Sequence, residues 1–204
     1  MSMIGLPSVA QYGSTVWAAS STPVVTKKSQ GRSPSGTVTA ERSSDRAPSF
    51  GAQLFDSAQQ AGATLEVVQL AARAVECGVA SGDIAVPTTL TVIDYSRPST
   101  DPRLWVFDVA TGRLLFKELV AHGRGTGENM AEHFSDAMDS HQSSLGLFVA
   151  RDTYVGHNGY SLRLDGLEPG FNARARERAI VMHGAPYVEG DFAARQGRLG
   201  RSWG

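Results

Sequence analysis

The amino-acid sequence predicts one α+β domain that contains more strand than helix and follows a polar N-terminal tail. Apolar residues recur three and four positions apart from Leu65 to Val79, which is typical of an amphipathic helix. Short runs rich in β-branched and aromatic residues come next, with Gly and Pro turn signals between them, and these are typical of strands. One helix followed by many strands favours an α+β or mostly β domain.

Composition and charge argue against some partners and some structural features. The 19 Lys and Arg residues balance the 20 Asp and Glu residues, for a net charge of −1. This balance argues against a nucleic-acid surface or an anionic membrane as the main partner. The 204 residues, 41% of them hydrophobic, suffice for one core and a tail. No apolar run approaches the ~18 residues of a transmembrane helix, and the single cysteine, Cys77, excludes an intrachain disulfide.

Residues 1–52 form the predicted tail, and residues 53–204 form the predicted domain. The segment from Ser20 to Phe50 is nearly free of large apolar residues. It cannot bury enough surface to offset its ordering entropy, so we expect it to be disordered. Residues 4–19 hold a weak apolar stretch with no Lys or Arg before it, which is at best a degenerate export signal. The preferred alternative is a disordered N-terminus or one that begins at an incorrect start site.

The predicted helix of residues 65–79 buries one face. Its apolar stripe includes Val68, Ala72 and Val75, and Gly82 lies just beyond its end as a stop signal. Cys77 lies on the flank of that stripe, and a thiol in apolar surroundings is typical of core packing rather than of a nucleophile. We therefore expect Cys77 to be buried and unreactive.

Five strands are predicted between the helix and residue 164. Turn residues at 110–113 and 156–159 indicate two hairpins. Two short helices are predicted near the C-terminus: Asn172–Arg178, with Arg174, Arg176 and Arg178 facing solvent, and Asp191–Gln196, ended by Gly197. The predicted strands are Leu90–Tyr95, Leu104–Val109, Leu114–Ala121, Leu145–Ala150 and Ser161–Leu164.

The polar segment 123–144 is too long for a simple connection, so we expect it to form a wall or lid of a cleft. Its glycines at 123–127 are not followed by the Gly-Lys-Ser/Thr of a phosphate loop. His133, Asp136, Asp139 and His141 are metal-capable residue types without a recognised ligand spacing. A solvated loop is the preferred interpretation, and we predict no metal site.

The candidate site lies in the last stretch of the chain. The apolar run 179–182 ends on His183-Gly184, so a short buried strand is predicted to deliver an imidazole, whose ordinary pKa suits proton transfer near neutrality. Small residues at Ser202 and Gly204 suit a tight turn whose backbone N–H groups hold an anion. The structural alternative is a capped core histidine and an ordinary polar tail. His122, which also ends a predicted strand, and Tyr160 are further candidates.

Together these residues resemble the murein L,D-transpeptidase catalytic domain family, whose motif is His-Gly, a spacer, and Ser/Thr-x-Gly-Cys. His183-Gly184 matches the first half, and Ser202-Trp203-Gly204 matches the second half up to its cysteine. The family's cysteine would follow Gly204, so the domain is expected to be incomplete at its C-terminus and inactive as given. The resemblance covers roughly residues 53–204. Further matching segments, in family order, are residues 90–100, 103–108, 119–123, 143–148 and 159–167.

The resemblance implies a β-sandwich with an N-terminal helix and short peripheral helices, and an acyl transfer that forms 3→3 peptidoglycan crosslinks. His183 would be the general base, oriented by the carbonyl of Gly184. Backbone N–H groups of Trp203 and Gly204 would contribute to the oxyanion hole. Tyr160, His122 and Arg201 are the expected substrate-binding residues. No metal or organic cofactor is implied. The implied partners are peptidoglycan stem peptides, in the periplasm or after secretion, and oligomeric state is not predicted.

Two other functions are compatible with the same residues. A non-catalytic cell-wall binding or scaffold protein would keep the cleft for muropeptides without a nucleophile. A metal-dependent peptidase would use the histidines, but His122, His133, His141 and His183 lack ligand spacing.

Overall fold

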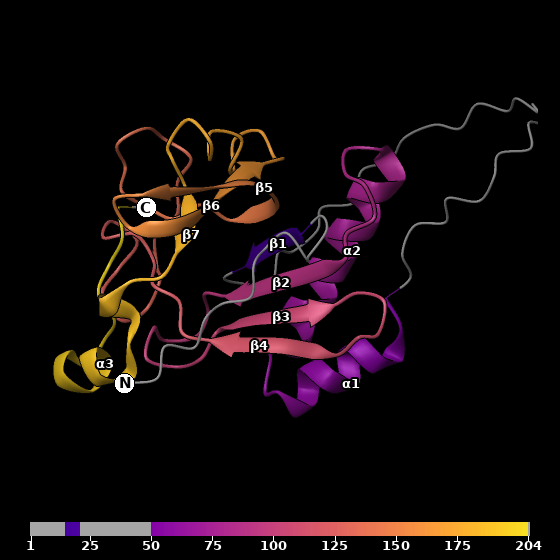
Figure 1. The fold of residues 1–204 in the computed structure, drawn as a ribbon, viewed down its shortest axis with the longest axis horizontal. Coiled ribbons are helices and arrows are strands. Elements are labelled where there is room, and N and C mark those ends of the chain that lie inside the picture. The colour runs from indigo at the N-terminus through magenta and orange to yellow at the C-terminus, as the bar shows by residue number, and fades with distance from the viewer. Residues whose placement is uncertain (1–14, 21–49, 204) are drawn as a thin grey trace, which may run out of the picture.

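The computed structural model describes residues 50–203 and, for the backbone alone, residues 15–20. Figure 1 shows the arrangement of its elements. In chain order these are β1 (Thr15–Ser20), α1 (Ala52–Gln60), α2 (Leu65–Ser81), β2 (Thr89–Asp94), β3 (Leu104–Asp108), β4 (Leu114–Glu118), β5 (Gly146–Gly156), β6 (Gly159–Gly166), β7 (Val181–His183), the 3-10 helix η2 (Pro186–Val188) and α3 (Gly190–Gln196).

The strands form a mixed sheet in the order β4-β3-β2-β1-β5-β6-β7. Two antiparallel units of three strands, β2–β4 and β5–β7, are joined by β1, which pairs parallel with β2 and antiparallel with β5. The predicted α+β class, with more strand than helix, is confirmed. This strand order does not confirm the two-sheet sandwich that the resemblance implies.

Alternating side chains of the central strands supply two separate cores. Leu90 and Val92 of β2 pack with α1 and α2 in the first core cluster. Ile93 and Tyr95 face the other way, because successive side chains of a strand point to opposite faces. They pack with Phe148 in the second core cluster, which also contains Leu104, Val120, Leu164 and Ala175. In Figure 1, α3 and the C-terminus lie on the side of the molecule away from α1 and α2.

The prediction of a continuous tail over residues 1–52 is wrong at residues 15–20, which form β1. Its partners, β2 and β5, lie far away in sequence, so a reading of local composition gives no signal for this pairing. The other residues of the predicted tail before residue 50 lie outside the described ones. The predicted domain boundary at residue 53 falls at the start of α1.

The predicted helix is confirmed as α2, which Gly82 ends in the left-handed conformation at φ 81°. Its buried face contains Val68, Ala72 and Val75 as expected. The prediction for Cys77 is wrong, because this side chain is exposed. Leu70, which shares that flank of the helix, is 37% exposed. The flank of the stripe therefore faces solvent rather than the core.

The predicted strands and both hairpins are confirmed, with β3 and β4 forming one and β5 and β6 the other. The predicted helix 191–196 is confirmed as α3, which ends at Gly197 with φ 68°. The run 179–182 yields only the three-residue strand β7. Its residues are half-buried, because they line a cleft rather than a closed core.

The prediction of a helix at Asn172–Arg178 is wrong, since this segment is a series of turns. Asn172 is fully buried and does not cap a helix. Its Oδ1 accepts from the N–H of Glu168 at 2.8 Å, and its Nδ2 donates to the carbonyl of Leu147 at 3.0 Å. Arg178 is not on a solvated face either, because its side chain is only 5% exposed.

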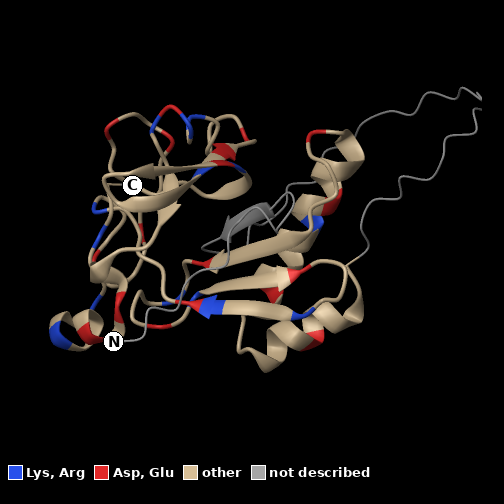
Figure 2. Ribbon diagram, in the orientation of Figure 1, with Lys and Arg blue, Asp and Glu red and all other residues tan. Residues whose placement is uncertain are grey.

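Charged residues of both signs are interspersed over the described part of the chain (Figure 2). This distribution agrees with the near-zero net charge. Among the described residues, no helix combines the length and the apolar character that a bilayer span requires.

Candidate active site

A cleft of about 320 Å³ lies over the second core cluster. His183 and the C-terminal segment both line it, so the structure brings together the two halves of the predicted motif. The lining comprises residues of the β2 end, the segments 120–121 and 143–144, Phe148, Asn158, Leu164, residues 179–183, Tyr187 and residues 201–203. Gly204, the last residue of the predicted motif, lies outside the described residues.

The sheet positions His183 at the end of β7, where it lies opposite Ser161 of β6. The Nδ1 atom of its ring is 2.9 Å from the carbonyl oxygen of Gly184. Because a carbonyl only accepts hydrogen bonds, we assign the proton to Nδ1, which leaves the lone pair on Nε2. A neutral imidazole in this tautomer is able to accept a proton at Nε2.

The C-terminal segment is tied to the chain that follows β4. Ser202 forms an isolated parallel bridge with Gly123. The N–H of Ser202 donates to the carbonyl of His122 at 3.0 Å, and its carbonyl accepts from the N–H of Arg124 at 2.9 Å. The next N–H, that of Trp203, donates to no acceptor within the described residues. It therefore remains available to an anion.

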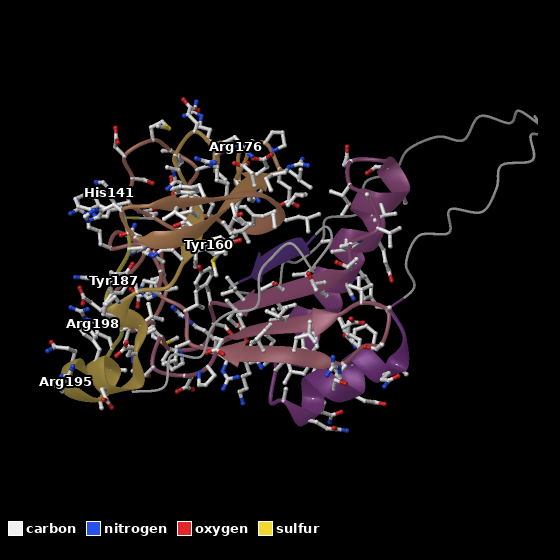
Figure 3. All side chains as sticks on the ribbon, in the orientation of Figure 1. His141, Tyr160, Arg176, Tyr187, Arg195 and Arg198 are labelled. Atoms are coloured by element: carbon white, nitrogen blue, oxygen red, sulfur yellow. The ribbon has the colours of Figure 1, made fainter. Side chains whose placement is uncertain are left out.

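Gly200 and Tyr187 hold this segment against the cleft wall. The N–H of Gly200 donates to the carbonyl of Tyr187 at 2.9 Å. A Cβ atom on Gly200 would lie only 2.5 Å from the Cβ of Tyr187, so a larger residue does not fit without movement. Tyr187 lines the cleft (Figure 3), and burial raises the pKa of its phenol. The sequence analysis predicted neither the close approach of Gly200 to Tyr187 nor the position of Tyr187 in the cleft wall.

His122 does not line the cleft as predicted, because its side chain is only 1% exposed. Its Nδ1 accepts from Nη2 of Arg103 at 2.9 Å, and its Nε2 donates to the carbonyl of Glu128 at 3.0 Å. Burial, and then the nearby guanidinium of Arg103, lower the pKa of His122 to about 4. The ring is therefore neutral at neutral pH and supports the backbone carbonyl that binds Ser202.

Arg103 is itself fully buried under the cleft. Its Nε and Nη2 donate to the carbonyl of Val120 at 3.1 and 2.9 Å, and its Nη1 donates to the carbonyl of Arg97 at 2.8 Å. Its guanidinium also lies 5.0 Å from the ring centre of Tyr95, a cleft-lining phenol. Burial raises the pKa of Tyr95 and lowers that of Arg103. These contacts fix the floor of the cleft.

The two other predicted substrate-binding residues are placed differently. Arg201 lines the cleft, but its Nη1 lies 2.6 Å from Oε1 of Glu128, in an ion pair. Tyr160 is 48% exposed, pairs with Val155 near the β5–β6 turn and is not among the lining residues. In Figure 3 it lies apart from Tyr187. Tyr160, an expected substrate-binding residue, therefore does not contribute to the lining of this cleft.

The segment 123–144 forms part of the cleft wall through Ser143 and Ser144. Thr126, which is fully buried, holds it together, since its Oγ1 accepts from the N–H of Ser143 at 2.7 Å. Two of the metal-capable residues of this segment, Asp136 and His141, have other side-chain contacts. Asp136 accepts from the N–H of Arg174 at 3.1 Å, and among the described residues no group of three or more metal-capable side chains gathers.

Trp203 has an environment that the sequence does not reveal. Its indole is 69% exposed, yet the guanidinium of Arg124 lies 3.8 Å from its ring centre. His141 approaches the edge of the same ring, with ring centres 4.9 Å apart, and its Nδ1 donates to the carbonyl of Trp203 at 3.2 Å. Arg124 and His141 are far from Trp203 in sequence, so no local pattern predicts either contact.

Comparison with known proteins adds one finding to this geometry. A family model described as the L,D-transpeptidase catalytic domain matches residues 59–204, which contain every described residue of the cleft. Searches of curated proteins and of solved structures found no match. Because the family model covers most of the chain and includes the cleft with His183, this chain belongs to the L,D-transpeptidase catalytic domain family.

Proposed function

We propose that the cleft is the catalytic site of a murein L,D-transpeptidase, which joins peptidoglycan stem peptides by 3→3 crosslinks. One observation carries the proposal: His183 and the Ser202-Trp203 turn line the same cleft. The hydrogen bond from Nδ1 of His183 to Gly184 supports it, because it leaves Nε2 as a base. Membership of the family supports the same reaction class.

The reaction is an acyl transfer through a thioester. In the family motif, the nucleophilic cysteine occupies the position after Gly204, beyond the last residue of the printed sequence. Nε2 of His183 takes the thiol proton, and the thiolate attacks the carbonyl carbon of the third residue of the donor stem. The C–N bond to the terminal D-alanine breaks, and the imidazolium returns its proton to the leaving amine. An amine of a second stem then attacks the thioester, and the thiol is released.

Two backbone features give the site its orientation and its electrostatics. The carbonyl of Gly184 holds the ring of His183 in one tautomer, as the third member of a nucleophile–base–orienter set. The N–H of Trp203 and that of Gly204 are the proposed oxyanion donors, and such donors are effective because they are already aimed where charge develops.

This chemistry requires no metal or organic cofactor. Because peptidoglycan lies outside the cytoplasmic membrane, we propose that the protein acts in the periplasm or after secretion.

The test compares the 204-residue polypeptide with a version extended through the family's cysteine-bearing segment. Both carry Cys77→Ser, because Cys77 is exposed and would react on its own account. Each is incubated with a carbapenem, whose strained acyl group reacts with an activated thiolate, and its intact mass is recorded. We expect an adduct on the extended form alone. An extended form that binds stem peptides but never forms an adduct would instead support the non-catalytic, cell-wall binding function.

His183→Gln in the extended form tests the base. We expect the acylation rate to fall by about 10²–10⁴-fold, the usual contribution of a positioned acid or base. His133→Gln is the matched control, since His133 is exposed and does not line the cleft. Equal losses in the two variants would refute the assignment of His183.

A further inference from the structure

At the mouth of the cleft, an exposed aromatic ring is held rigidly. Trp203 is 69% exposed, but Arg124 covers its face and His141 holds its edge and its carbonyl. Side chains that are both exposed and already ordered are the ones that bind partners at low entropic cost. The Arg124–Trp203 pair is therefore a candidate recognition element.

Arg124 is fixed at both ends by the same turn. Its backbone N–H donates to the carbonyl of Ser202 at 2.9 Å, and its guanidinium lies 3.8 Å from the ring centre of Trp203. A guanidinium stacked on an aromatic face keeps its N–H donors at its rim, where they match the two oxygens of a carboxylate. Within the described part of the chain, no carboxylate forms an ion pair with Arg124.

The neighbouring arginines are already neutralised or buried. Arg201 and Arg198 share the carboxylate of Glu128, at 2.6 and 2.9 Å. Arg178 is 5% exposed and directed into the 135–144 segment. Arg201 was the substrate-binding arginine expected from the sequence, but its ion pair reduces the charge it presents to a ligand. Arg124 thus holds the accessible positive charge beside the motif turn.

We propose that Arg124 binds the C-terminal carboxylate of the donor stem peptide, a role that rests on the proposed function of the cleft. That carboxylate is separated from the scissile carbonyl carbon only by the nitrogen and Cα of the terminal D-alanine. Trp203, under the guanidinium, is two positions before the nucleophile of the family motif. Arg124 is not itself among the residues that line the cleft, but it stacks on Trp203, which does line it, and its side chain is exposed there. From this position at the edge of the cleft, Arg124 holds the carboxylate of the leaving D-alanine and selects stems that still carry it.

The test measures binding to the 204-residue polypeptide by calorimetry, which needs no nucleophile. The probes are a synthetic stem tetrapeptide with a free C-terminal D-alanine and the same peptide ending in D-alanine amide. We expect the wild type to bind the acid about tenfold more tightly than the amide, a loss typical of one charge-assisted contact. Arg124→Ala should abolish this preference, and Arg124→Lys should keep part of it. The matched control is Arg195→Ala, which removes an exposed arginine of α3 (Figure 3). This variant should leave the preference intact.

Two outcomes would overturn the proposal: a wild type that binds acid and amide equally, or an Arg124→Ala variant that weakens both probes to the same extent. The second outcome would mean that Arg124 only orients Trp203. The adduct test on the extended form is independent of these results. If the extended form makes an adduct but the protein binds the acid and the amide equally, the transpeptidase function stands and the Arg124 site does not. If the protein prefers the acid but the extended form makes no adduct, the Arg124 site stands and the transpeptidase function does not.

Discussion

Arg178 and Arg176 are two residues apart, carry the same charge and each interact with aspartates, but we expect removal of Arg178 to destabilise the fold much more than removal of Arg176. The side chain of Arg178 is 5% exposed, whereas that of Arg176 is 49% exposed. Arg176 pairs with Asp165 and Asp152 in solvent, where ion pairs contribute little to stability. Burial therefore decides the difference, and Arg176→Ala is a matched control for Arg178→Ala.

The magnitude for Arg178→Ala follows from its contacts. Nη1 donates to the carbonyl of Ser135 at 2.6 Å and to Oγ of Ser144 at 2.7 Å. Nη2 donates to the carbonyl of Gln142 at 2.5 Å and to Oγ of Ser140 at 3.2 Å. Truncation leaves the carbonyl of Gln142 without a donor, at about 1–3 kcal/mol if it stays buried, whereas the carbonyl of Ser135 keeps a hydrogen bond from Oγ of Ser144 at 3.0 Å. Loss of the charge-assisted bonds to the hydroxyls of Ser144 and Ser140 adds to this cost. Water entering from the loop surface reduces that cost, so we expect a loss of about 3 kcal/mol.

Urea denaturation of the 204-residue polypeptide, followed by circular dichroism, measures this loss as a lower midpoint at unchanged slope. For a chain of this size the same loss lowers the melting temperature by about 6–12 °C. Amide exchange should become faster in the segment 135–144, which Arg178 holds. A free-energy loss below about 1 kcal/mol, or one no larger than that of Arg176→Ala, would refute the reasoning.

Two further predictions concern the support of the motif turn. Because the pKa of His122 is about 4 in the folded protein and about 6.5 when unfolded, the unfolded chain binds the proton more readily. The contribution of neutral His122 to the free energy of unfolding is therefore complete above pH 6.5. It is lost as the pH falls toward 4, by up to about 3 kcal/mol. Urea titrations at several pH values should show a steeper pH dependence for the wild type than for His122→Gln, and parallel curves would contradict this assignment. Gly200→Ala should destabilise the fold by about 1–3 kcal/mol, because its Cβ would lie 2.5 Å from Tyr187. Gly190→Ala, where a Cβ meets nothing within 4 Å, is the control, and equal melting temperatures for the two variants would show that the close approach of Gly200 is relieved by a small shift.

Local patterns predicted the elements whose cause is local. The stripe of α2 and its stop at Gly82 follow from helical spacing, and the turn at Gly156–Gly159 follows from glycine conformations. Where contacts distant in sequence decide, the local pattern failed. The segment after Asn172 has a helix-like composition, but the buried amide of Asn172 bonds to Leu147 and Glu168 and draws the backbone into turns.

For the candidate site, the residue types alone were enough to predict the family resemblance and the two halves of the motif, because residue types at motif positions are local information. Which side chains are accessible at the site follows from the folded chain. His122 and Arg201 have the residue types for substrate binding, but one is buried against Arg103 and the other is paired with Glu128, 73 positions away. Arg124 is exposed and stacks on Trp203, whereas the carboxylate of Glu128 pairs with Arg201 and Arg198. Charge pairing and burial depend on distances that only the folded chain defines.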